Sequence, residues 1–119
     1  MKKKSTSILQ KEKRFEELKA GLSDLGLILQ GTITERVIQR DDPKQEGKTK
    51  AYGPYYQWTF KKEGKTVTQN LTGQQAEQYQ KAIENHRTME AMIQEMRTLS
   101  LEILTESIEG VKRRKKPSD

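Results

Sequence analysis

The hydrophobic positions of the chain follow two periods, which predict two helices on either side of a small sheet. Apolar residues recur every three or four positions from Phe15 to Leu29 and again from Met89 to Ile103, the spacing of one helix face. Between them, β-branched and aromatic residues alternate with polar ones, which is typical of strands with one buried face. The pattern predicts an α+β fold in the order helix, three-stranded antiparallel meander, long helix.

Glycine, proline and capping residues set the expected bounds of these elements. Gly21 and Gly26 weaken the first helix, because each glycine costs about 1 kcal/mol relative to alanine, so we expect it over about 7–24. Thr72 and Gln75 have the spacing of a capping box, so a long helix is expected over about 73–108. The predicted strands cover 31–38, 55–61 and 66–71, with a compact turn at 62–65. Residues 40–54 are predicted to form a long polar loop, with Gly53-Pro54 as the turn into the second strand.

The alternation also divides the predicted sheet into two faces. One face is expected to pack against a helix and holds Ile33, Val37, Tyr56, Trp58, Phe60, Val67 and Leu71. The other face is polar and contains no carboxylate: it holds Thr32, Thr34, Arg36, Tyr55, Gln57, Thr59, Lys61, Thr66, Thr68 and Asn70. Hydroxyls, amides and cations of this kind bond phosphates and base edges. The alternative is that an exposed sheet face is rich in threonine simply because threonine favours strands.

Charge changes this picture, because the net charge of +6 is unevenly distributed. Residues 31–70 hold eight Lys or Arg against five Asp or Glu, whereas residues 71–110 hold three against seven. Residues 1–7 and 111–119 are expected to be disordered basic segments on either side of one domain at 8–110. This asymmetry indicates a polyanionic partner at the sheet and tails. The candidate nucleic-acid-binding residues are Thr32, Thr34, Arg36, Lys48, Lys50, Tyr55, Gln57, Thr59, Lys61, Thr68, Lys112, Arg113, Arg114, Lys115 and Lys116. The run at 112–116 is equally compatible with a targeting signal or with simple solubilisation.

The long helix carries a second candidate surface. A helix of about 35 residues is about 50 Å long, which exceeds what a small sheet can cover, so its second half needs another partner. The candidate residues for a dimer or partner contact are Met89, Met92, Met96, Leu99 and Ile103. A coiled-coil seam is the favoured interpretation over a peptide-binding groove. The competing solution is an antiparallel hairpin with the first helix of the same chain.

The sequence offers few candidate catalytic or metal-ligating residues, so we expect no enzymatic activity, cofactor, metal or small-molecule substrate. The chain contains no cysteine, and its single histidine, His86, lies in the long helix with no nucleophile to serve. Asp41-Asp42 precede a proline and are typical of a turn rather than a metal site. No apolar run approaches the about 20 residues that cross a membrane. We therefore expect a cytoplasmic protein.

Three short motifs resemble those of a family of small uncharacterised prokaryotic proteins that often lie in mobile-element or phage neighbourhoods. The motifs are Gly31-Thr32-Ile33-x-Glu35-Arg36, Gly53-Pro54-Tyr55-Tyr56 and Gly64-Lys65-Thr66. Members usually carry a Cys-x4-Cys-x-Cys cluster and a histidine before Gly-Pro-Tyr-Tyr, which looks metal-binding. This chain has no cysteine and no histidine in that loop, so the resemblance does not imply a zinc site here. The order of three strands and a capped helix also resembles the arm-type DNA-binding domains of phage integrases, by topology only.

These observations together predict a non-enzymatic accessory protein of a mobile element, with a role such as transposition. The sheet would bind nucleic acid, with duplex DNA favoured over RNA, at the prokaryotic nucleoid. The long helix would form a homodimer or dock on a larger phage or mobile-element machine. The alternatives are a protein–protein adaptor that acts through its helices, and an RNA-binding protein that uses Tyr55 and the basic loop.

Overall fold

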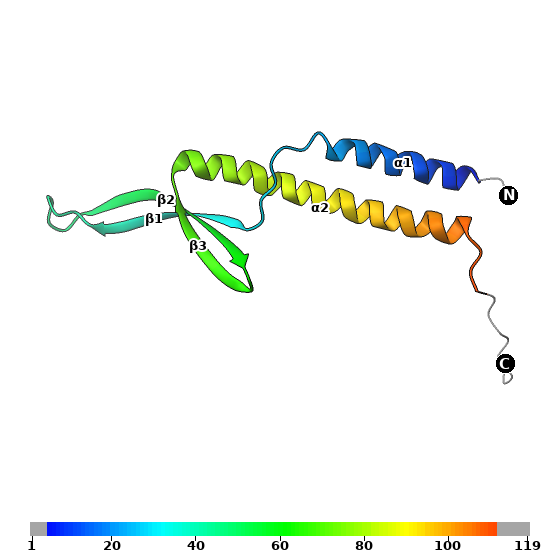
Figure 1. Ribbon diagram of the computed structural model, residues 1–119. Helices are drawn as coiled ribbons and strands as arrows, with labels where there is room; N and C mark the ends of the chain where they lie inside the picture. The colour runs from blue at the N-terminus through cyan, green and yellow to red at the C-terminus, as the bar shows by residue number, and fades with distance from the viewer. Residues whose placement is uncertain (1–4, 112–119) are drawn as a thin grey trace. The chain divides into compact units, whose positions relative to one another are not determined.

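The computed structural model describes residues 5–111, and it confirms the predicted order of elements (Figure 1). These are α1 (Thr6–Leu22), β1 (Thr32–Asp41), β2 (Thr49–Lys62), β3 (Lys65–Leu71) and α2 (Gly73–Ser107). Residues 5–111 form two compact units. The sheet unit is Leu25–Thr88, and the helical unit combines residues 5–24 with residues 89–111. The long helix α2 contributes to both units.

Side-chain caps begin both helices. The Ser5 side chain accepts a hydrogen bond of 3.2 Å from the Ile8 N–H, so α1 begins at Thr6, one residue before the predicted helix. At α2, the Gln75 N–H donates to Thr72 Oγ1 at 3.1 Å, and the Thr72 N–H donates to Gln75 Oε1 at 2.9 Å. The predicted capping box is therefore confirmed.

The sheet unit packs one face of an antiparallel sheet, in the order β1-β2-β3, on the first half of α2. Its most buried side chains are Leu71, Ala76 and Ile83, and Ile83 is only 2% exposed. Trp58 stacks on Phe60 and meets Tyr79 edge-on, with ring centroids 3.8 and 5.3 Å apart. Full burial of one large aliphatic or aromatic side chain stabilises a fold by about 1.5–3 kcal/mol. The expected packing of the aromatic face on a helix is thus present, and it occurs near Tyr79 and Ile83 of α2.

The segment before β1 closes over Trp58. The Trp58 indole Nε1 donates a hydrogen bond of 2.9 Å to the Gln30 carbonyl oxygen. Gly31 follows with φ of 115°, and a Cβ placed there would lie 2.5 Å from both Trp58 Nε1 and the Thr59 carbonyl oxygen. Only glycine combines that backbone conformation with so close an approach.

The predicted loop over 40–54 is wrong, because most of it belongs to a β-ribbon. β1 continues to Asp41 and β2 begins at Thr49, so the connecting loop spans only residues 42–48. β3 ends opposite Tyr56, so beyond that point β1 and β2 continue as two strands only. Most side chains of this ribbon are exposed. The ribbon therefore lacks the alternation of apolar and polar residues from which strands are predicted.

Gly53-Pro54 does not lead into β2 but forms a bulge inside it. Arg36 is opposite Tyr55 and the next aligned pair is Ile38 with Tyr52, so β2 has one more residue than β1 across this interval. Gly53 has φ of 125°, and a proline suits a bulge because it has no N–H to contribute to the ladder. Val37 lies opposite the bulge and is 55% exposed, although the sequence places it on the packed face.

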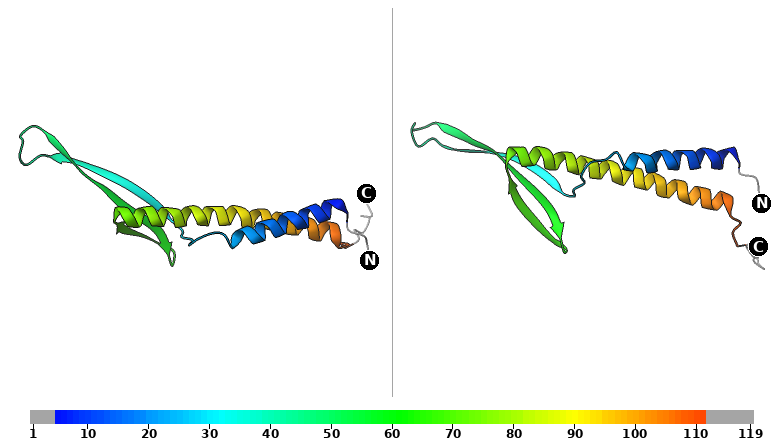
Figure 2. Two further views of the ribbon diagram at one scale, coloured as in Figure 1. Left: turned by 90° about the horizontal axis from the view of Figure 1, so that it is seen from above. Right: turned by 45° about the horizontal axis from the view of Figure 1, so that its top comes forward.

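The helical unit is an antiparallel hairpin within one chain. α1 lies alongside the second half of α2 in each view (Figures 1 and 2). Ile8 and Leu18 are its buried side chains in α1. A Cβ on Gly21 would lie 2.9 Å from Met92 Cε, which shows how closely the two helices approach. The structure thus contains the hairpin that the sequence offers as the competing solution for the long helix.

Ion pairs join the two helices of this hairpin. Arg14 donates two hydrogen bonds to the Glu95 carboxylate, at 2.7 and 3.1 Å. Lys11 lies 3.4 Å from the Glu102 carboxylate and also bonds Glu106. The hydrogen bond from Arg14 lowers the pKa of Glu95, and the hydrogen bond to Glu106 raises the pKa of Lys11. All of these pairs are exposed, so each contributes little to stability on its own.

Candidate nucleic-acid interface

The strand register brings the predicted polar residues onto one face of the sheet. Directly opposed residues of antiparallel strands lie on the same face. Thr34 is opposite Gln57, and Gln57 is opposite Asn70, so polar side chains from three strands form a row. The residues that the pairing places on this polar face are Thr32, Thr34, Arg36, Tyr55, Gln57, Thr59, Lys61, Thr66, Thr68 and Asn70.

Two cross-strand contacts hold this polar face in place. Gln57 Nε2 donates a hydrogen bond of 3.1 Å to Asn70 Oδ1. The hydroxyls of Thr59 and Thr68 lie 3.4 Å apart. Within residues 5–111, the Gln57 Oε1 acceptor and the Asn70 amide donors make no other hydrogen bond. This pair therefore presents an acceptor and a donor next to one another.

The bulge in β2 extends the polar face outward along the ribbon. Tyr52 and Tyr55 are three positions apart and would lie on opposite faces of a regular strand. The extra residue of the bulge puts both tyrosines on the polar face, opposite Ile38 and Arg36. Arg40 and Lys50 form the next pair on this face, and Lys50 Nζ lies 5.6 Å from the centroid of the Tyr52 ring. The ribbon thus places the predicted Lys50 on this face and adds one cation, Arg40, and one aromatic ring, Tyr52, to the predicted interface.

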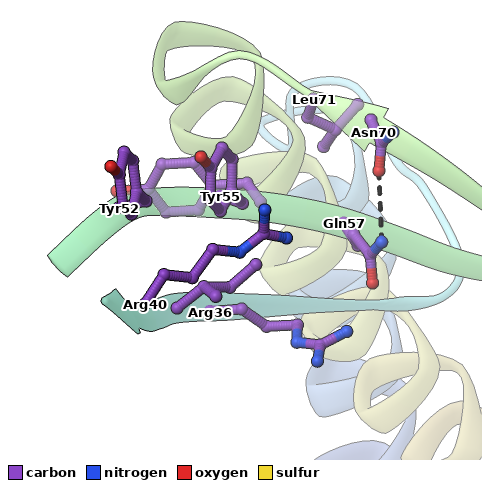
Figure 3. Close-up of a pocket in the computed structure, with 9 residues that line it drawn as sticks. Arg36, Arg40, Tyr52, Tyr55, Gln57, Asn70 and Leu71 are labelled. Carbon is purple, nitrogen blue, oxygen red and sulfur yellow. Dashed lines mark hydrogen bonds between the residues drawn. The ribbon is translucent and has the colours of Figure 1, made fainter. Parts of the chain in front are cut away.

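A shallow hollow of about 370 Å³ lies where β3 ends and the ribbon begins. Two arginines, three tyrosines and two amides supply its polar lining, and Tyr55 is 47% exposed (Figure 3). In that view Tyr52 and Tyr55 both project from β2. The complete lining is Arg36, Ile38, Arg40, Tyr52, Tyr55, Tyr56, Gln57, Asn70 and Leu71. We call this feature the tyrosine–arginine hollow.

The polar face is positively charged and has no internal counter-charge. Arg36 and Arg40 make no ion pair with any residue between 5 and 111. The carboxylates of Glu35 and Asp41 belong to the opposite face, because Glu35 is opposite Tyr56 and Asp41 is opposite Thr49. By contrast, the basic residues of α1 that face α2 are engaged by glutamates. An uncompensated cluster of arginines is an attractive site for an anion.

Six predicted residues do not belong to the polar face that the structure describes. Lys48 belongs to the 42–48 loop at the end of the ribbon. The basic residues Lys112, Arg113, Arg114, Lys115 and Lys116, like the first four residues, lie outside the part of the chain that the structure describes. The sequence interpretation missed Tyr52 and Arg40 as members of the interface: it assigned 40–54 to a loop and selected only Lys48 and Lys50 from it. The Gly53-Pro54 pair was the available signal, since it is compatible with a bulge as well as a turn.

The predicted partner stripe is half-buried inside the helical unit. This holds for Met89, Met92, Met96, Leu99 and Ile103. The large apolar side chains of α2 that remain well exposed lie elsewhere on the helix: Leu101 and Leu104 are 67% and 56% exposed. A dimer or partner complex through residues 89–108 stays a prediction, and these side chains are the apolar surface available to it.

The rest of the described chain adds no metal or membrane-spanning site. No cluster of three or more His, Cys, Asp or Glu side chains suited to a metal ion occurs among residues 5–111. Within the same residues, neither helix has the length and apolar character needed to cross a membrane. No protein-family model, curated protein or solved structure matches this chain.

Proposed function

We propose that this protein is a non-enzymatic DNA-binding accessory factor whose polar sheet face binds duplex DNA. The observation that carries the proposal is a continuous face, shared by three strands and the ribbon, that presents uncompensated cations and no carboxylate. A two-stranded ribbon or small sheet can enter the major groove. Arg36, Arg40 and Lys61 would contact phosphates or guanine edges, while the threonine hydroxyls and amides would bond phosphates and bases.

The helical unit would supply the contact with a protein partner. The hairpin of α1 and α2 would dock on a larger machine or on a second copy of the chain, with the long helix shared between docking and DNA-binding units. The resemblance to mobile-element and phage-associated proteins favours a role in transposition or phage biology, at the nucleoid of a prokaryotic cell. A protein adaptor and an RNA-binding protein are the alternatives that binding measurements distinguish.

A matched pair of double variants tests DNA binding at this face. Arg36→Gln with Arg40→Gln removes two cations from the polar face, and Lys62→Gln with Lys65→Gln removes two cations that oppose each other at the β2–β3 turn. We expect the arginine variant to bind a duplex of about 20 base pairs at least tenfold more weakly, because a good arginine–base contact contributes about 1–3 kcal/mol. The lysine variant should remain within about threefold of the wild type.

Fluorescence anisotropy with labelled duplex DNA, single-stranded DNA and RNA gives the comparison. Circular dichroism and Trp58 emission establish that each variant is folded. Equal losses in the two double variants would show that the polar face is not the interface. Tighter binding of RNA than of duplex DNA would favour the RNA-binding alternative, and no binding to any nucleic acid would favour the adaptor.

A further inference from the structure

We propose that the tyrosine–arginine hollow holds one unpaired nucleobase, so that the protein prefers duplex DNA with an extruded base over fully paired duplex. The inference rests on the proposed function and specifies the substrate class of the same face. It draws on three features of the hollow. Two tyrosines share one face of β2, an amide acceptor and an amide donor have no further hydrogen-bond partner among residues 5–111, and two arginines have no carboxylate partner among the same residues.

The tyrosine rings supply a stacking surface. The bulge puts Tyr52 and Tyr55 on the same face, and the Tyr55 side chain is about half exposed. Proteins that bind unpaired bases stack them on exposed aromatic rings, because every base offers a π-face. A fully paired duplex keeps its bases stacked on each other and cannot use this surface.

The amide pair supplies hydrogen bonds to the base edge. The hydrogen bond from Gln57 to Asn70 fixes both side chains and leaves Gln57 Oε1 and the Asn70 amide group available at the hollow that both residues line. An adjacent acceptor and donor match N6–H and N7 of adenine, the edge that Asn and Gln side chains bind in DNA complexes. An adenine is therefore a suitable probe base.

The arginines supply the contact to the flanking backbone. Arg36 and Arg40 line the same hollow and have no carboxylate partner among residues 5–111. Because β3 ends opposite Tyr56, no third strand covers the hollow beyond this point. Its volume of about 370 Å³ falls within the about 300–1,000 Å³ of small-ligand clefts. One nucleotide can therefore enter from the open side while the adjoining duplex lies on the sheet face.

Three duplexes with identical flanking sequences test the inference. The first is fully paired, the second contains one unpaired central adenosine, and the third contains an abasic site at that same unpaired position. The abasic duplex keeps the extra backbone unit of the second but has no base to stack. We expect the wild type to bind the adenosine bulge about tenfold tighter than the abasic bulge, the order that one stacked base contributes.

Variants then locate the effect in the hollow. Tyr52→Leu and Tyr55→Leu should each reduce the ratio of the two bulge affinities to within about threefold of unity. Gln39→Ala lies on the opposite face of the ribbon, opposite Ala51, and should retain the wild-type ratio. Trp58 emission establishes whether each variant is folded. If a variant unfolds, the wild-type affinities for the adenosine and abasic bulges still decide whether a base is captured.

The possible results separate this inference from the function on which it rests. Equal affinity of the wild type for adenosine and abasic bulges, with the paired duplex also bound, would overturn base capture and leave duplex binding intact. Retention of the ratio in both tyrosine variants would overturn the assignment to this hollow. No binding to any of the three duplexes would overturn the proposed function and this inference with it.

Discussion

At the scale of single residues, Gly31 is a position of the sheet unit that has no room for a side chain. It combines a φ of 115° with an approach to Trp58 and Thr59 that leaves no room for a Cβ. The Trp58 indole is fixed there by its hydrogen bond to Gln30 and by stacking on Phe60. The neighbouring groups are backbone and a packed ring, so they cannot move aside cheaply.

We expect Gly31→Ala to destabilise the sheet unit by about 3 kcal/mol or more. The unfavourable φ alone costs about 1–3 kcal/mol, and the steric clash adds to it. The matched control is Gly47→Ala, which has a φ of 77° but nothing within 4 Å of its Cβ, so it should lose only about 1–2 kcal/mol. Urea denaturation followed by Trp58 emission measures both. Equal losses would mean that the close approach to Trp58 adds nothing to the cost.

At the scale of elements, the helical unit depends on polar contacts between α1 and α2 as well as on its few buried side chains. The Arg14–Glu95 pair has two hydrogen bonds, which is the geometry in which an exposed ion pair contributes most. Because the bond to Arg14 favours the ionised form, the pKa of Glu95 is lower in the folded chain than its ordinary value of 4.5. The unfolded chain therefore binds a proton at Glu95 more readily than the folded chain does.

The stabilisation from this pair should be complete above about pH 5 and should disappear as the pH falls below 4.5, through the lowered pKa of folded Glu95. Glu95→Gln should therefore lower the Tm of the helical unit at about pH 6 and have little effect at about pH 3. Glu16→Gln on α1 is the control, because Glu16 makes no ion pair with residues 5–111. Circular dichroism melting at both pH values measures the difference. A Glu95→Gln effect that persists at the lower pH would contradict the assignment.

Self-association belongs to the same scale, because α2 keeps exposed apolar side chains after α1 has packed on it. Leu101 and Leu104 lie three positions apart on one face of α2, and Ile108, which follows the last helical residue, is 63% exposed. We expect a dimer or partner complex through residues 89–108. Leu101→Lys with Leu104→Lys should weaken a dimer at least tenfold in sedimentation equilibrium and leave helicity unchanged. A wild-type chain that is monomeric at several hundred micromolar would contradict the dimer.

At the scale of the whole molecule, the net charge of +6 predicts how DNA binding depends on salt. If about five phosphates are neutralised, log K should fall with log salt at a slope of about −4 to −5. Deleting residues 112–119 removes five Lys or Arg. The slope should become shallower by about one for each phosphate that those side chains neutralise, equally for all DNA sequences. Anisotropy titrations from about 50 to about 300 mM NaCl measure both slopes, and an affinity independent of salt would contradict binding through phosphates.

The sequence alone determined the features that arise from neighbouring residues. The alternation around Trp58 placed the polar and packed faces of the sheet, and Thr72 with Gln75 marked where α2 begins. Period-three-and-four apolar spacing identified both helices. Each of these signals is local, because caps, turns and periodicity act over a few residues and need no knowledge of distant partners.

Only the tertiary structure decided which distant segments meet. The ribbon was missed because a strand that is solvated on both faces has no hydrophobic alternation, and β2 finds its partner in β1, a separate segment of the chain. The bulge at Gly53-Pro54 shifted Tyr52 onto the face of Tyr55, and a shift of one residue reverses a strand's faces. Likewise, the sequence favoured a dimer or partner complex for the apolar stripe of α2 and offered packing against the first helix as the competing solution. The Gly21–Met92 approach and the Arg14–Glu95 pair show that α1 packs on it within one chain.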